Sequence, residues 1–176
     1  MNKMIKKLTV CIAVAFMATG CGHRATSKPS TAHSQYNYSH KLQIADQTLM
    51  VEIADTSAKM QTGLGGRGSL SGDEGMLFDF HTANGASPAF WMKDMKFNLD
   101  FIWSYKNKIV GITNDVPAPS VNCQSSSSAR TERDGLIVNC QLPYYYPPSP
   151  VDWVLEVNAG WSKAHNVKVG DAVELK

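Results

Sequence analysis

The sequence predicts an α+β domain that is mostly β, with a compact, curved or barrel-like antiparallel sheet and one or two short helices. Short runs of alternating apolar residues recur between clusters of turn-forming residues, as in a sheet with one buried face. The stretch 75–101 also carries eleven large apolar side chains. Each of these stabilises the fold by roughly 1.5–3 kcal/mol when fully buried. Only short segments fit a helix.

The first predicted elements are a hairpin over 41–45 and 48–54, turning at Asp46 and Gln47, and a short helix over 57–64. Thr56 is a residue type that caps a helix N-terminus. A glycine cluster at 63–68 follows and contains Arg67. The lysine of a phosphate-binding loop does not follow these glycines, so they indicate a helix stop and a turning loop.

The middle of the chain predicts strands over 75–80, 89–92, 98–104 and 108–113. The long segment at about 116–150 is rich in proline, serine and tyrosine, with a short strand at 135–139. A buried strand over 151–160 comes next, then a short helix or turn over 159–166. A loop at 167–171 leads into a final strand, and residues 41–176 make one globular domain with a long loop insertion.

Residues 1–20 have the three-part layout of an export signal. Three lysines precede the apolar run 8–18, and small residues lead to Cys21. The run is shorter than the roughly 20 apolar residues that span a bilayer. Small residues before a cysteine resemble the lipobox of bacterial lipoproteins, so we expect a lipid on Cys21; an ordinary signal peptide with a chance cysteine is the alternative. Residues 21–40 are polar and are predicted to be a disordered tether.

The predicted location is the cell envelope. Gly22 rather than aspartate follows the lipidated cysteine, which resembles outer-membrane sorting, so the expected site is the periplasmic face of the outer membrane if the host has two membranes. Without residues 1–20 the chain has 14 Lys+Arg against 15 Asp+Glu, a net charge of −1. This balance argues against nucleic-acid binding.

Two cysteines of the predicted domain, Cys123 and Cys140, flank much of the long insertion. An exported protein meets conditions in which disulfides persist, and a bridge closing a loop of this length contributes about 3 kcal/mol. A metal site is the weaker alternative, because no nearby residues complete a four-ligand set. We expect neither a metal nor a cofactor.

The order of several motifs resembles the domain-of-unknown-function 192 family. A short helix runs into Gly-Leu and an arginine, and GMLF, FWMK with a following Leu-Asp, and VLEVNAG come later in the chain. The resemblance covers about residues 42–176 and implies a compact, mostly β, often exported domain without an established activity. The sequence departs from the family pattern at Asp94-Met95 and at Asn98, where relatives commonly have Asn-Thr and proline.

The charged residues within the apolar strands allow two interpretations. His81 with Asp79 or Asp100 could serve a hydrolase-like or metal-dependent enzyme, because histidine near a carboxylate is a common general base or metal ligand. The simpler interpretation is a surface histidine in a turn. Lys93, Asp94, Asp100 and Glu156 form either an outward ion pair or a ligand site, since an unpaired buried charge is costly.

The leading prediction is a non-enzymatic, lipid-anchored domain that binds a small molecule, a glycan or another envelope protein. Its expected contact surface is the FWMK region with the tyrosine-rich loop, since tyrosine combines contact area with a hydrogen-bonding tip. The residues assigned to that surface are Trp91, Lys93, Asp94, Glu156, Tyr144, Tyr145 and Tyr146. The membrane is the other expected partner, reached through the lipid.

Overall fold

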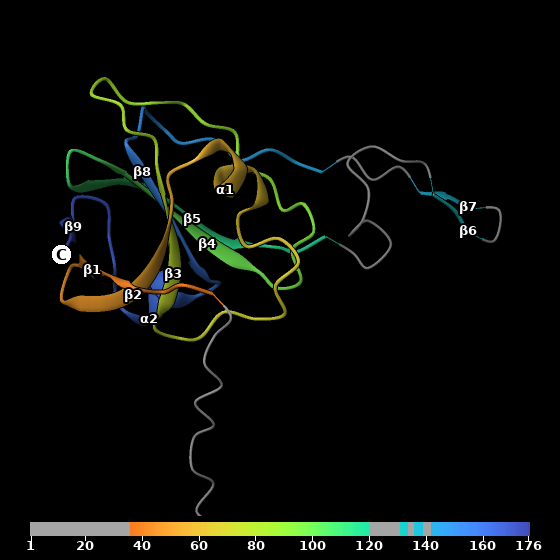
Figure 1. The fold of residues 1–176 in the computed structure, drawn as a ribbon, viewed down its shortest axis with the longest axis horizontal. Helices are drawn as coiled ribbons and strands as arrows, with labels where there is room; N and C mark the ends of the chain where they lie inside the picture. Colours follow the sequence, from red (N-terminus) through yellow and green to blue (C-terminus); the bar gives the residue numbers. More distant parts are fainter. Residues whose placement is uncertain (1–35, 120–130, 134–135, 139–141) are drawn as a thin grey trace, which may run out of the picture. The chain divides into compact units, whose positions relative to one another are not determined.

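The computed structural model describes residues 36–119, 131–133, 136–138 and 142–176. Its main feature is a seven-stranded sheet with the order β5-β4-β8-β3-β2-β1-β9 (Figure 1). The strands are β1 (His40–Ile44), β2 (Gln47–Ala54), β3 (Glu74–Asp79), β4 (Leu99–Tyr105), β5 (Lys108–Val116), β8 (Trp153–Asn158) and β9 (Val173–Leu175). The predicted hairpins at 41–54 and 98–113 and the strand near the C-terminus are confirmed.

The sheet curls until its two outer strands meet. The amide of Ile109 in β5 donates to the carbonyl of Asp171 at 2.9 Å, and the amide of Val173 in β9 donates to the carbonyl of Asn107 at 3.0 Å. Lys108 and Ala172 form an antiparallel bridge at the same place. The predicted curved sheet is thus confirmed, and the C-terminal segment closes it.

Two short helices accompany the sheet, as predicted. Helix α1 (Ser57–Thr62) is capped by Thr56, whose hydroxyl accepts a hydrogen bond from the amide of Lys59 at 3.3 Å. Helix α1 lies in the connection between β2 and β3, which are parallel. Parallel neighbours need a crossover of this kind, whereas the other neighbouring strands of the sheet are antiparallel. Helix α2 (Trp161–Ala164) follows β8.

The predicted strand over 89–92 is wrong. In this segment Phe90 alone forms a β-bridge, to Tyr145. The preceding strand β3 has β2 on one side and β8 on the other, so it leaves no free edge for a hairpin partner. Residues 89–92 therefore run as a loop across the core.

The long insertion is described only in part. Strand β7 (Leu136–Val138) falls within the strand predicted at 135–139 and pairs with β6 (Thr131–Arg133) in a separate two-stranded ladder. Cys123 and Cys140 lie outside the described residues, as does the predicted signal with Cys21. Neither helix in the described part of the chain is long and apolar enough to cross a membrane.

Strand alternation divides the core into two clusters, one on each face of the sheet. Phe101 and Trp103 of β4 belong to a cluster rich in aromatic side chains, together with Phe78 and Phe90. Ile102 points to the opposite, mostly aliphatic cluster. The aromatic face also carries the loop segment 88–96, and the candidate site lies there.

Candidate functional site

A pocket of about 700 Å³ opens on the aromatic face of the sheet. Its walls come from three parts of the chain: residues 60–66 at the end of α1 and the loop after it, the end of β3, and the loop 88–96. Glu156 of β8, an interior strand of the sheet, lies among the lining residues. The pocket is thus built on a sheet but enclosed by loops, an arrangement common for ligand sites.

The glycines after α1 allow the two loops to approach closely. A Cβ on Gly65 would lie 2.9 Å from the carbonyl oxygen of Thr62 and 3.3 Å from that of Lys93. The amide of Gly66 donates to the carbonyl of Asp94 at 2.9 Å. Gly63 ends α1 with a positive φ of 52°, so the predicted helix stop is confirmed. The same cluster also forms one wall of the pocket, which was not anticipated.

Glu156 is the buried carboxyl group of this site. Only 5% of the residue is exposed, and its Oε2 atom has no hydrogen-bond partner among the described residues. Burial raises the pKa of the Glu156 carboxyl to about 8, and the positive charge of Arg67 offsets part of that effect. The group therefore keeps its proton near neutral pH, when a normal glutamate is ionised.

Arg67 lies close to Glu156 but is bonded elsewhere. Its guanidinium donates to Glu52 Oε2 at 2.9 Å and to the hydroxyl of Tyr38 at 2.8 Å, and it lies 3.8 Å from the ring centre of Tyr36. Glu52 and Glu156 are both paired to Met76 across the sheet, so they share one face. Arg67 thus donates a hydrogen bond to Glu52, while only its positive charge acts on Glu156.

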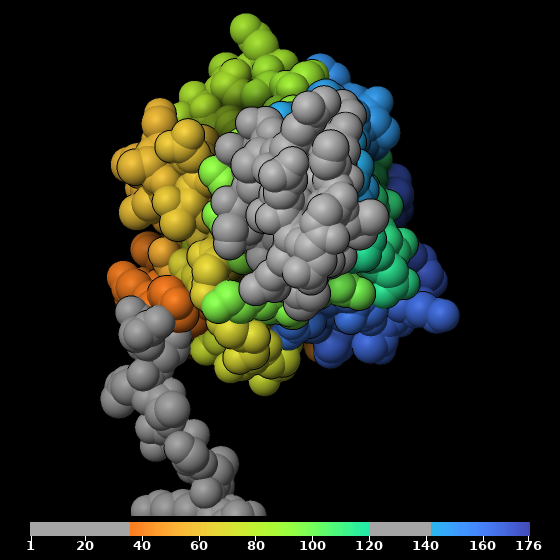
Figure 2. Space-filling view, turned by 90° about the vertical axis from the view of Figure 1, so that its right-hand side faces the viewer, coloured from red at the N-terminus to blue at the C-terminus, as the bar shows by residue number. Residues whose placement is uncertain are grey.

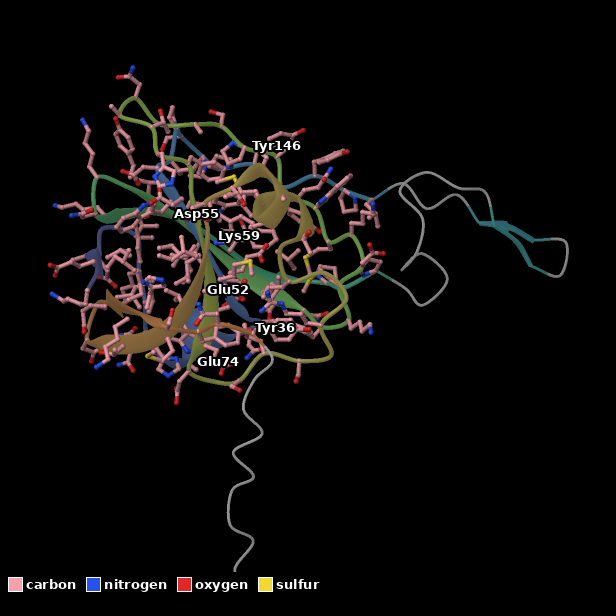
Figure 3. All side chains as sticks on the ribbon, viewed as in Figure 1. Tyr36, Glu52, Asp55, Lys59, Glu74 and Tyr146 are labelled. Carbon is pink, nitrogen blue, oxygen red and sulfur yellow. The ribbon has the colours of Figure 1, made fainter. Side chains whose placement is uncertain are left out.

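Arg67 holds the first described residues, Tyr36 and Tyr38, against the domain. Tyr36 and Tyr38 fall within residues 21–40, yet they pack around a side chain of the domain. Figure 2 shows the orange start of the described chain against the gold and yellow segments that include α1 and the loop after it. In Figure 3, Tyr36 lies below Glu52 on the same side of the domain.

An aromatic rim adjoins the pocket. The rings of Trp91 and Tyr144 stack with centres 5.8 Å apart, and Lys93 Nζ lies 5.6 Å from the Trp91 ring centre. Tyr145 instead turns inward and pairs with Phe90 through two backbone hydrogen bonds of 2.8 and 2.9 Å. Tyr146 is 62% exposed at the surface (Figure 3).

Asp79 and His81 lie together at the end of β3 but do not line the pocket. The His81 amide donates to Asp79 Oδ1 at 2.9 Å, and its ring Nδ1 is 3.4 Å from the same oxygen. The His81 side chain is 64% exposed, and the backbone of His81 has a positive φ of 47°. This geometry is that of a turn after a strand.

Asp100 lies on the opposite face of the sheet and is fully buried. Its carboxylate accepts three backbone hydrogen bonds of 3.0 Å, from Asp115, Gly160 and Ser162. The predicted pairing of Asp100 with His81 therefore does not occur in the structure. Asp100 instead joins β4 to the end of β5 and the start of α2.

The structure brings together four of the predicted binding residues, namely Trp91, Lys93, Asp94 and Glu156. Met60, Gln61 and the glycine loop were missed, because the sequence does not show that α1 packs beside the loop 88–96. The unusual density of glycines was the one available signal of close approach. No group of three or more metal-ligating side chains occurs among the described residues.

The structure is that of a mostly β domain with a curled sheet and a pocket enclosed by loops. The chain belongs to the domain-of-unknown-function 192 family, described as "Uncharacterized ACR", and matches the family over residues 40–175. A comparison with curated proteins finds no match.

Two crystal structures share the fold. One, from Sinorhizobium meliloti 1021, is named a "putative transcription regulator"; it has a TM-score of 0.62 and 25% identity, over 77% of this chain and 92% of that one. The other is a protein of unknown function from Novosphingobium aromaticivorans DSM 12444, with a TM-score of 0.59 and 23% identity, over 76% of this chain and 83% of that one.

Proposed function

We propose that this protein is a lipid-anchored cell-envelope protein that binds a small ligand, without catalysis, in the pocket at Glu156. The observation that supports binding most strongly is the buried Glu156 Oε2 atom, which has no hydrogen-bond partner among the described residues and lies beside a large pocket. Buried polar groups are nearly always hydrogen-bonded, and an exception marks a site where a ligand or water completes the bonding. A pocket of about 700 Å³ is in the range of small-molecule sites.

The surroundings of the pocket support a ligand with an apolar body. Phe78, Phe80, Phe90 and Trp91 line it, and the stacked pair of Trp91 and Tyr144 adds an exposed aromatic surface beside it. Aromatic side chains provide much contact area at a low entropic cost. The exposed Tyr146 extends this surface, where an envelope protein or a glycan could make further contact.

Filling the mouth of the pocket is expected to abolish binding without harming the fold. Ala89 is exposed and lines the pocket, so Ala89→Trp places bulk in the mouth rather than in the core. A ligand at about 100 times its Kd stabilises a protein by about 2.7 kcal/mol. Compounds that raise the Tm of the wild-type chain should therefore leave the Tm of Ala89→Trp unchanged.

The matched control is Ala83→Trp, because Ala83 is also exposed but does not line the pocket. This variant should respond to ligands as the wild type does. Equal responses of the wild type and Ala89→Trp to every bound compound would show that the pocket is not the binding site.

The lipid anchor predicts a change in fractionation. Cys21→Ser removes the expected acylation site, so the protein should move from the membrane pellet to the soluble fraction of lysed cells. Cys11→Ser, inside the apolar run of the signal, is the control and should leave the protein in the pellet. Retention of Cys21→Ser in a carbonate-washed pellet would contradict the anchor.

A further inference from the structure

The buried acidic group of the pocket is the carboxyl group of Glu156. The Glu156 carboxyl is buried, and its Oε2 atom accepts no hydrogen bond from a described residue. The nearby guanidinium of Arg67 donates to Glu52 and Tyr38 instead. Nothing else in the described part of the chain offers Glu156 Oε2 a donor, so a ligand group that donates hydrogen bonds would complete its hydrogen bonding.

The outer part of the pocket carries the opposite charge. Lys93 and Lys96 line it, and Lys96 is exposed. Neither forms an ion pair within the described ranges of the chain, and the Lys93 ammonium lies over the Trp91 ring. Asp94 lies between the two lysines and balances one of their two charges. The lining thus has a carboxyl group deep inside and a net positive charge nearer the mouth.

Aromatic side chains also line the pocket. Phe78, Phe80 and Phe90 line the pocket, and the Phe78 and Phe90 rings pack edge to face at 4.9 Å. Aromatic rings suit a hydrocarbon or aromatic body, and their faces also attract a cation. The aromatic lining therefore favours a ligand that carries an apolar body as well as its charged groups.

We propose that the pocket takes a small zwitterion with an apolar body, of the class of amino acids and short apolar peptides. Its ammonium group would donate to Glu156, and its carboxylate would lie near Lys93 and Lys96. A neutral sugar would leave the lysines without a counter-charge, and a simple amine would meet their repulsion. This proposal rests on the proposed function, because it names the ligand of the same pocket.

Binding of such a ligand is coupled to a proton. Glu156 is protonated at pH 6.5, since burial raises its pKa to about 8, and an ammonium group pairs best with the ionised carboxylate. The proton of Glu156 should therefore leave as the ligand binds. The apparent affinity should rise by up to about tenfold for each pH unit between 5.5 and 7. The other charged or titratable groups on this side are Arg67, Glu52, Tyr38, Lys93, Asp94 and Lys96.

The test is calorimetric titration of the full chain with a series based on leucyl-leucine whose members share the apolar body and differ in their terminal charges. Its members are the free dipeptide, the C-terminal amide, the N-acetyl form and the form blocked at both ends, with phenylalanine and N-acetylglucosamine as further probes. The free dipeptide should bind at least about tenfold more tightly than each of its three blocked forms. Titration at pH 6.5 in buffers of different ionisation enthalpy should show close to one proton released.

Three variants separate the contributions. Glu156→Gln should weaken zwitterion binding at least about thirtyfold and abolish proton release, since one partner of a buried ion pair is lost. The double variant Lys93→Gln/Lys96→Gln should weaken binding of the free dipeptide about tenfold and should not weaken binding of its amide, which loses the repulsion of the two lysines. Glu174→Gln, at an exposed position, is the control and should bind as the wild type does.

The outcomes distinguish this proposal from the proposed function. Equal binding of free and blocked peptides, or of the wild type and Glu156→Gln, would overturn the zwitterion. Binding of N-acetylglucosamine alone, lost in Ala89→Trp, would also overturn it while supporting the pocket. If no probe binds and a wider compound panel raises no Tm, both proposals fail.

Discussion

Replacement of Asp100 by alanine is expected to lower the free energy of unfolding by about 3–5 kcal/mol. The Asp100 carboxylate is fully buried and accepts backbone hydrogen bonds from Asp115, Gly160 and Ser162. Alanine would leave these amide groups without their acceptor and create a small cavity. The loss should appear as a lower midpoint in urea unfolding with an unchanged m-value.

Two further variants test this account. Asp100→Asn keeps one acceptor oxygen but turns an NH₂ group toward backbone donors, so its loss should be intermediate. Asp115→Asn changes an exposed side chain at a positive φ of 54°, which asparagine tolerates, and should stay within about 0.5 kcal/mol of the wild type. A stability loss for Asp100→Ala below about 1 kcal/mol would contradict the role assigned to Asp100.

Stability should fall as the pH rises, and Glu156 should be the cause. The pKa of Glu156 is about 8 in the folded protein, whereas the pKa of an exposed glutamate is 4.5. Between these values the unfolded chain has released the proton that the folded protein still holds. The contribution of Glu156 is complete below pH 4.5 and disappears as the pH approaches 8. The free energy of unfolding should fall by up to about 1.4 kcal/mol per pH unit, or roughly 5 kcal/mol in all.

Glu156→Gln should remove this dependence, because glutamine stays neutral. At pH 8 the variant should be more stable than the wild type by a few kcal/mol, whereas near pH 4.5 the two should be similar. Glu174→Gln, at an exposed position, should keep the slope of the wild type. Urea unfolding at several pH values measures the effect, and parallel curves for the wild type and Glu156→Gln would contradict it.

Most strands could be predicted because their side chains alternate. In β4 this alternation puts Phe101 and Ile102 in opposite clusters of the core. The strand predicted over 89–92 is wrong because its composition resembles that of a strand. Whether it can pair with β3 depends on β2 and β8, which occupy both edges of β3. The parallel pairing of β2 with β3 is a long-range choice that no local pattern reveals.

The candidate site could be predicted only in part, for a similar reason. Glu156 was noticed because a charged residue inside an apolar strand requires a partner or a function. Trp91 and Lys93 were noticed in the FWMK motif. The wall formed by Met60 and the glycine loop depends on how α1 packs, and the engagement of Arg67 with Glu52 joins segments that are distant in sequence.

The closure of the sheet by its last residues bears on self-association. An unpaired strand edge can recruit a strand from another molecule. Strand β9 covers the outer edge of β1, while the segment just before it pairs with the start of β5. One short C-terminal segment thus shields both ends of the sheet. Truncating it, or displacing it with a fused tag, would expose two edges at once and favour aggregation.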